Sequence, residues 1–151
     1  MGLIMARNRV RAMAGRIDPQ PRPLSLSGMQ LVYIAIFGAL GCLSRYFVSG
    51  WTYSLAGRGL PYGTLAVNVA GSFLLGLIME GSLRSTLLSP EVRMGITVGF
   101  LGGFTTFSTF SYETFRLLEE GSLWQAGANI LLNVAVCLIF AGLGIHLARQ
   151  W

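Results

Sequence analysis

Four stretches of this sequence, each long enough to cross a lipid bilayer as a helix, contain no charged side chain. They are residues 24–44, 59–79, 94–112 and 121–145. A helix needs about 20 mostly apolar residues to span the hydrocarbon core, and only helices or closed barrels satisfy their backbone groups in lipid. Hydrophobic residues make up 53% of the chain and charged residues only 11%. The sequence therefore predicts an all-α integral membrane protein with four transmembrane helices.

The segments that join these stretches are short and carry helix-boundary signals. Ser89, Pro90 and Glu91 form the pattern of a helix start, with Ser as N-cap, Pro at the first helical position and an acid in the first turn. A turn is expected at residues 57–61, and Gly121 is expected to stop a helix. Such short connections leave no room for a separate soluble domain between the spans.

The centre of the third stretch is unsuited to a continuous helix. Gly102 and Gly103 stand next to each other and are followed by a run of hydroxyl and β-branched residues. Glycine costs backbone entropy in a helix, and Ser and Thr side chains compete for backbone hydrogen bonds. A helix break within a membrane persists only where protein or water pairs the freed backbone groups, and such breaks are where ions and substrates bind. We therefore expect a break near these glycines and a permeation or binding site beside it.

Polar residues within the second and fourth stretches recur at helical spacing and so share one face of each helix. They are Thr64, Asn68 and Ser72 in the second stretch, and Gln125, Asn129, Asn133 and Cys137 in the fourth. One interpretation is interhelical hydrogen bonding. For Asn68 and Asn133 the alternative is a watery or ion-lined track, because an amide has more groups than one contact satisfies. Glycines at positions 38, 41, 71 and 76 are expected to be close-packing contacts.

Arg45 and Glu113 are the ionisable residues nearest the membrane interior. A charge inside a membrane is by default a functional hypothesis, but both residues lie close to the ends of their stretches, so an interfacial role competes with it. The third stretch also repeats phenylalanine at positions 104, 107 and 110. Such rings usually pack in the core or face lipid. Their positive edges, together with the hydroxyls of Ser108 and Thr109, would alternatively suit a small anion that has shed its water.

Enzyme chemistry has no basis in this sequence. The two cysteines and the single histidine lack metal-ligand spacing, and there is no nucleophile–base pair and no phosphate-binding loop. We therefore expect neither catalysis nor a nucleic-acid partner.

Residues 1–28 differ in character from the membrane portion, residues 29–151. They carry five arginines against Asp18 alone. Two interpretations remain open: a disordered basic arm held against anionic lipid on the cytoplasmic side, or a start-site artefact with Met29 as the true first residue. From Met29 onward the chain has six arginines and five glutamates, which gives almost no positive-inside signal and permits insertion in both orientations. The arm, if present, favours both termini in the cytoplasm.

The membrane portion resembles the Fluc/CrcB fluoride-channel family over residues 29–149. The motifs that carry the resemblance are Gly38-Ala-Leu-Gly-Cys-Leu-Ser-Arg45-Tyr46, Gly63-Thr-Leu-Ala-Val-Asn68-Val-Ala-Gly71-Ser-Phe, Gly99-Phe-Leu-Gly-Gly-Phe-Thr-Thr-Phe-Ser-Thr-Phe-Ser111 and Asn129-x-x-x-Asn133. Four ordered motifs at matching spacing are specific.

The resemblance implies an antiparallel, dual-topology homodimer in the bacterial plasma (inner) membrane, with two fluoride pores and a structural sodium ion on the two-fold axis. It implies passive export of fluoride from the cytoplasm, which reduces fluoride toxicity. By position, the implied pore residues are Asn68, Phe107, Phe110, Ser108, Thr109, Arg45, Glu113 and Asn133. The implied sodium ligands are backbone carbonyls in the break from Gly103 to Thr106.

Two other functions compete with a fluoride channel. A small four-span multidrug transporter would need an acidic residue within the first span, and residues 31–44 contain none. A non-transporting assembly or scaffold subunit would need only the glycine-rich faces.

Overall fold

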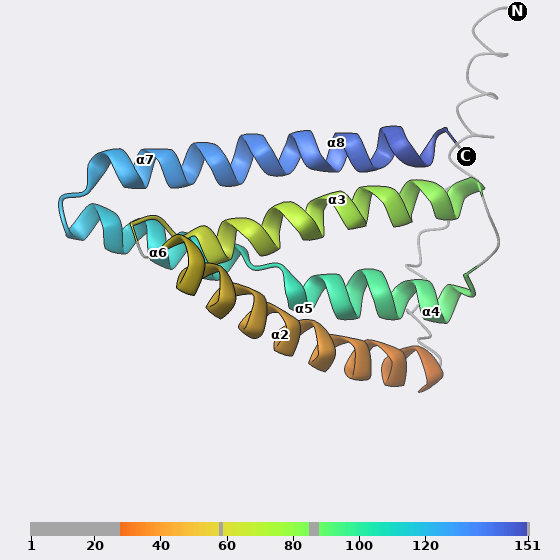
Figure 1. Cartoon of the computed structure of the whole chain (residues 1–151). Helices are drawn as coiled ribbons and strands as arrows, with labels where there is room; N and C mark the ends of the chain where they lie inside the picture. The colour runs from red at the N-terminus through yellow and green to blue at the C-terminus, as the bar shows by residue number, and fades with distance from the viewer. Residues whose placement is uncertain (1–27, 58, 85–87, 151) are drawn as a thin grey trace, which may run out of the picture.

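Four helical segments run side by side in alternating directions (Figure 1). The structure is a computed structural model, and it describes residues 28–57, 59–84 and 88–150. The first two segments are α2 (Gly28–Ala56) and α3 (Tyr62–Arg84). The third comprises α4 (Pro90–Met94), the π-helix η1 (Gly95–Leu101), α5 (Gly102–Phe104) and α6 (Phe107–Glu119). The fourth comprises α7 (Leu123–Leu131), the π-helix η2 (Leu132–Val136) and α8 (Cys137–Ala148). The basic arm predicted from the sequence lies outside the described residues, apart from Gly28.

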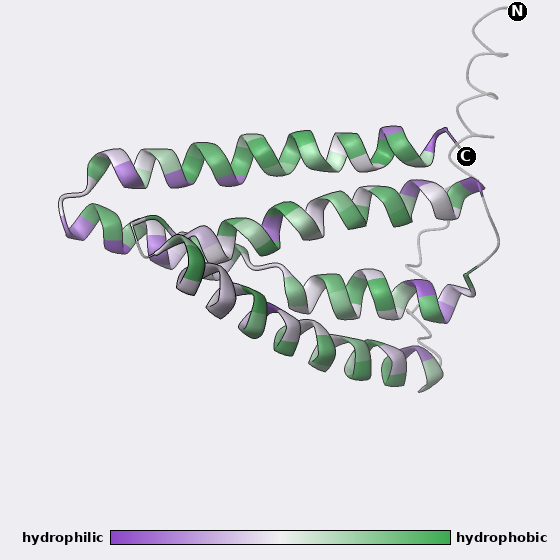
Figure 2. Cartoon of the chain, in the orientation of Figure 1, coloured by the Kyte–Doolittle hydropathy of each residue, from purple (hydrophilic) through white to green (hydrophobic). Residues whose placement is uncertain are grey.

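Three of the four segments are helices long and apolar enough to cross a membrane. They are Gly28–Ala56, Tyr62–Arg84 and Leu123–Ala148. The third segment is interrupted, so it does not form one spanning helix. Apolar residues dominate the length of all four segments (Figure 2). The all-α membrane architecture predicted from the sequence is therefore confirmed, with one helix broken.

The predicted helix boundaries are mostly confirmed. Ser89 caps α4, because its Oγ accepts a hydrogen bond from the N–H of Val92 at 3.3 Å, and Pro90 is the first helical residue. Gly57 and Gly121 end the α2 and α6 segments with φ angles of 76° and 73°, a conformation that favours glycine.

The first helix is longer than the uncharged stretch that predicts it. Helix α2 continues twelve residues beyond Ser44 to Ala56, so Arg45 lies within the helix rather than near its end. The interpretation of Arg45 as an interfacial residue assumes that the first span ends near Ser44. Arg45 does not end the helix, because its neighbours in sequence are mostly apolar. Its guanidinium donates to the carbonyl of Thr105.

The break in the third segment lies within the predicted range from Gly103 to Thr106, at its last two residues. Gly102 and Gly103 remain helical, and the extended residues are Thr105 (ψ 161°) and Thr106 (φ −154°, ψ 115°). The glycine at 103 serves packing instead, because a Cβ there would lie 2.7 Å from the carbonyl oxygen of Gly38 in α2. The break coincides with the hydrogen bonds between Asn68 and the backbone of Thr106, rather than with the two glycines of weak helix propensity.

Glycines bring the helix backbones into close contact, as the sequence predicts. A Cβ at Gly76 would overlap the carbonyl oxygen of Ala141, and a Cβ at Gly144 would overlap that of Phe73, so α3 and α8 approach closely at both sites. Gly41 of α2 allows the same approach to η1. Small residues at such crossings are typical of membrane helix packing.

Ion pairs mark both ends of the bundle. Glu80 pairs with Arg149 at 3.0 Å, which links α3 to α8 at the end where the chain terminus lies. Arg116 pairs with Glu119 and Glu120 at the opposite end. These ion pairs lie at the ends of the bundle, where the polar surfaces of a bilayer would be.

Candidate functional site

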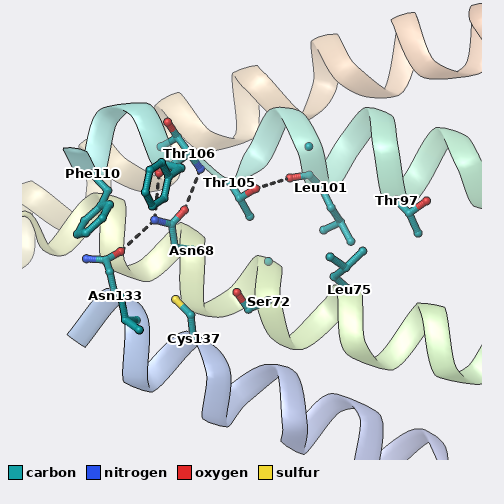
Figure 3. Close-up of a pocket in the computed structure, with 14 residues that line it drawn as sticks. Asn68, Ser72, Leu75, Thr97, Leu101, Thr105, Thr106, Phe110, Asn133 and Cys137 are labelled. Carbon is teal, nitrogen blue, oxygen red and sulfur yellow. Dashed lines mark hydrogen bonds between the residues drawn. The ribbon is translucent and has the colours of Figure 1, made fainter. Parts of the chain in front are cut away.

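The break is held open by a single asparagine of α3. The Oδ1 of Asn68 accepts the N–H of Thr106 at 2.8 Å, and its Nδ2 donates to the Thr106 carbonyl at 3.1 Å (Figure 3). The amide thereby pairs with both backbone groups of one residue, much as a neighbouring strand would. Freed backbone groups in lipid need such partners.

A chain of buried hydrogen bonds continues from Asn68 to the fourth helical segment and back to α6. Asn68 Nδ2 donates to Asn133 Oδ1 at 3.0 Å, Asn133 Nδ2 donates to Asn129 Oδ1 at 2.9 Å, and Asn129 Nδ2 donates to Thr114 Oγ1 at 2.8 Å. Thr114 Oγ1 then donates to the carbonyl of Phe110 at 2.7 Å. This series of hydrogen bonds therefore ends at the backbone of Phe110, one helical turn beyond the break.

This network engages both asparagines in interhelical hydrogen bonds, the first of the two interpretations of the polar faces. Each amide nitrogen has two hydrogens. Those of Asn68 are used by Thr106 and Asn133, and those of Asn133 by the Oδ1 and the carbonyl of Asn129. In this arrangement neither side chain has a spare donor for an anion.

Hydroxyl groups gather at the start of α6. Thr106 caps that helix through its Oγ1, which accepts the N–H of Thr109 at 3.1 Å. The same oxygen lies 3.0 Å from Thr109 Oγ1 and 3.3 Å from Ser108 Oγ. Ser108 and Thr109 are both exposed in the protomer. The sequence signal that locates the break is this Thr106 cap, rather than the two glycines that precede it.

The cap and the Asn68 contact each free a backbone carbonyl. In a continuous helix the N–H of Thr106 would donate to Gly102, and that of Thr109 to Thr105. Both N–H groups are diverted to side chains, so the carbonyls of Gly102 and Thr105 lose their helical donors. The Nη1 of Arg45 lies 3.4 Å from the Thr105 oxygen. Arg45 therefore reaches the level of the break.

The two phenylalanines after the break have opposite environments. Phe110 is 7% exposed, whereas Phe107 is 78% exposed in the protomer. Their ring centroids are 5.4 Å apart with a 56° angle between the planes. Phe104, the third member of the repeat, is buried and stacks on Phe100 at 5.7 Å. The repeat thus divides into one packing residue and two residues at the site.

A hollow of about 310 Å³ lies beside the break (Figure 3). Residues from three of the four segments line it, among them Asn68, Ser72, Thr106, Phe110, Asn133 and Cys137. Three of its polar lining residues, Asn68, Thr106 and Asn133, belong to the hydrogen-bonded network around Asn68.

A second hollow of about 890 Å³ lies on the other side of the break. Arg45, Thr106, Thr109 and Glu113 line it, so it brings the two predicted intramembrane charges to one cavity. Glu113 Oε1 accepts a hydrogen bond from the hydroxyl of Tyr53 at 2.8 Å. Sequence reasoning missed Tyr53, because no pattern in α2 distinguishes it from the other aromatic residues of that helix.

This chain is similar to known proteins over most of its length. The profile of the family described as "CrcB-like protein, Camphor Resistance (CrcB)" matches residues 32–145, which include every helix that carries the site. The chain belongs to the CrcB family. The resemblance drawn from the sequence motifs is thereby confirmed.

Curated members of the CrcB family match this chain over nearly their full length. A protein of Syntrophotalea carbinolica is 76% identical over 122 residues, which are 81% of this chain and 99% of the relative. A protein of Geotalea uraniireducens is 66% identical over 119 residues (79% and 96%), and one of Geobacter metallireducens is 63% identical over 122 residues (81% and 98%). Each is named "Fluoride-specific ion channel FluC".

Proposed function

We propose that this protein is a fluoride-selective channel of the bacterial inner membrane that exports fluoride from the cytoplasm by passive diffusion and so reduces fluoride toxicity. The observation that carries the proposal is the 76% identity to a FluC protein of which the chain covers 99%. At that identity the ion and the pathway are expected to be shared. The same likeness supports transport rather than catalysis.

The pathway is proposed to run past the break and the start of α6. The rings of Phe107 and Phe110 lie 5.4 Å apart, and their edges, which carry partial positive charge, would attract a small anion without trapping it. Ser108 and Thr109 supply hydroxyl donors in place of water. Ring edges and hydroxyl groups bind an anion weakly, and weak binding suits fast passage, because conduction requires weak sites.

The remaining proposed pore residues have distinct roles. Asn68 and Asn133 maintain the shape of the break, and either contacts the anion only after releasing a hydrogen bond. Arg45 supplies positive charge to the larger hollow, and in the part of the chain that the structure describes it pairs with no carboxylate. Glu113 also lines that hollow.

The functional unit is proposed to be an antiparallel, dual-topology homodimer. The nearly balanced arginines of residues 29–151 permit both orientations. Phe107 is 78% exposed, and α2 exposes a row of large apolar residues to lipid or to a partner copy. A second copy packed here would cover Phe107 and complete the walls of the pathway.

A structural sodium ion is proposed at the dimer axis, held by backbone carbonyls of the break. The donor set fits a hard cation, because carbonyls that lack their helical donors are hard oxygen ligands. The carbonyls of Gly102 and Thr105 lose their helical donors, and Thr105 would bind sodium once Arg45 Nη1, 3.4 Å from its oxygen, moves away. The Thr106 carbonyl, implied with that of Gly103 by the resemblance, accepts from Asn68. Bound sodium would supply positive charge and cross-link the two breaks.

Efflux from liposomes tests the proposed function. Purified protein is reconstituted, and the release of fluoride and chloride is followed with ion-selective electrodes. Rapid fluoride release with negligible chloride release is expected. Release of neither anion from protein shown to be a folded dimer in sodium would refute a channel and favour the transporter or scaffold alternatives.

A further inference from the structure

The side-chain carboxylate of Glu113 makes one hydrogen bond to another helix among the described residues. Its Oε1 accepts from the Tyr53 hydroxyl at 2.8 Å, across 60 residues of sequence. Its Oε2 is buried, with no hydrogen-bond partner among the described residues. Buried polar atoms are nearly always paired, so an unpaired carboxylate oxygen calls for an explanation. A carboxylate held by one contact is also easily turned away.

The Tyr53–Glu113 pair lies between two hollows. The inner hollow, of about 890 Å³, extends to the hydroxyls of the break and to Arg45. The outer hollow, of about 380 Å³, is lined by the α2–α3 connection and by Arg116 near the end of α6. Tyr53 and Glu113 line both hollows and are the residues that the two share. The pair is therefore the boundary between the helix break and one end of the bundle.

The tyrosine ring is held in place by the packing of α2 against α3. A Cβ at Gly63 would lie 2.7 Å from Cε2 of Tyr53 and 2.9 Å from the carbonyl oxygen of Ser49. Only glycine leaves room for the ring at this crossing. The hydroxyl is thus presented at a fixed position, whereas the carboxylate that it contacts is free at one oxygen.

We propose that the Tyr53 hydroxyl is an anion-binding donor on the fluoride pathway, and that Glu113 occupies this donor when no ion is there. The proposal rests on the proposed function as a fluoride channel. A phenolic O–H has one proton to donate, so a carboxylate oxygen and a fluoride ion compete for it. Glu113 turns away as fluoride arrives, and it returns when the ion leaves.

The charges around the pair make this exchange feasible. Two negative charges at one donor repel each other, which drives Glu113 away from an arriving anion. Arg45 lines the inner hollow and bears a positive charge that no carboxylate pairs with in the described residues. On the outer side, Arg116 is already paired with Glu119 and Glu120. Positive charge is therefore greater on the inner side, which draws the ion past the pair.

The test is the variant Tyr53→Phe, which removes the hydroxyl and keeps the ring. Fluoride efflux from liposomes is measured over a range of fluoride concentrations. We expect the half-saturating concentration to rise about tenfold, the factor that corresponds to ~1.4 kcal/mol. A purely structural role would instead lower the amount of folded dimer or the maximal rate. Tyr33→Phe is the matched control, because Tyr33 packs on Phe37 at the other end of α2 and lines neither hollow.

A double-mutant cycle with Glu113→Ala completes the test. Because the two side chains share one donor, the effects of Tyr53→Phe and Glu113→Ala are expected to be non-additive. Additive effects, an unchanged concentration dependence in Tyr53→Phe, or an equal change in Tyr33→Phe would each overturn the proposal. Absence of fluoride efflux from the wild-type protein would refute the proposed function itself, so the two failures are distinguishable.

Discussion

Asn68 pairs with both backbone groups of Thr106, accepting its N–H at 2.8 Å and donating to its carbonyl at 3.1 Å. One side chain on α3 thus replaces the two helical hydrogen bonds that a break in a membrane helix would otherwise leave unmade. Thr106, held by this contact, also caps the start of α6 through its own side chain.

Asn68→Ala is expected to lower both conduction and stability. The change removes two hydrogen bonds to Thr106 and one to Asn133, worth about 2 kcal/mol together at the average for interhelical bonds. Thermal unfolding in detergent and fluoride efflux measure the two effects. Ser82→Ala is the control on the same helix, because the Ser82 hydroxyl donates to the carbonyl of Ile78 in its own turn rather than to another helix. Equal stability of the two variants would contradict the role assigned to Asn68.

Phe107→Ile and Phe110→Ile are expected to abolish fluoride flux while the dimer still forms. They should differ in stability. Phe110 is 7% exposed, so its replacement costs about 1–2 kcal/mol, whereas Phe107 is 78% exposed and its replacement costs little in the protomer. Efflux, with dimer content checked by size-exclusion chromatography, separates the pore role from packing. Undiminished flux in both variants would remove these residues from the pore.

Gly144→Ala is expected to destabilise the bundle by about 1–3 kcal/mol, because the added Cβ overlaps the Phe73 carbonyl and forces α3 and α8 apart. At Gly142, on the same helix, an added Cβ would meet no atom of another segment within 4 Å. Gly142→Ala should therefore be neutral, or stabilising by up to about 1 kcal/mol. Thermal unfolding of both variants side by side checks the prediction, and the reverse order would show that α8 packs differently.

Removal of sodium is expected to weaken the dimer. An ion that binds only the folded dimer stabilises it by about 2.7 kcal/mol when present at 100 times its dissociation constant. Replacing sodium with N-methylglucamine should therefore shift the protein toward monomer, as measured by analytical ultracentrifugation in detergent. Return of sodium should restore the dimer. The same dimer fraction in both cations would exclude a structural sodium site at the carbonyls of Gly102 and Thr105.

The sequence by itself determined the membrane class, the helices and most of the residues at the site. Long uncharged stretches admit only helices in lipid, and the Ser89 cap and Gly121 stop act within a few residues of themselves. The 3.6-residue period places Asn129 and Asn133 on one face, and their side chains are joined by a hydrogen bond of 2.9 Å. Such features are local, so a linear pattern records them.

Only the tertiary structure decided where the third helix breaks and what reaches the break. Within the predicted range from Gly103 to Thr106, Gly103 stays helical and packs against α2, and the hydrogen bonds of Asn68 to Thr106 hold the extended residues at Thr105 and Thr106. The approach of Arg45 to Thr105 and the pairing of Tyr53 with Glu113 each join residues 60 positions apart. Contacts of this kind arise from how whole helices cross, and helix crossing is set by packing across segments that no local pattern encodes.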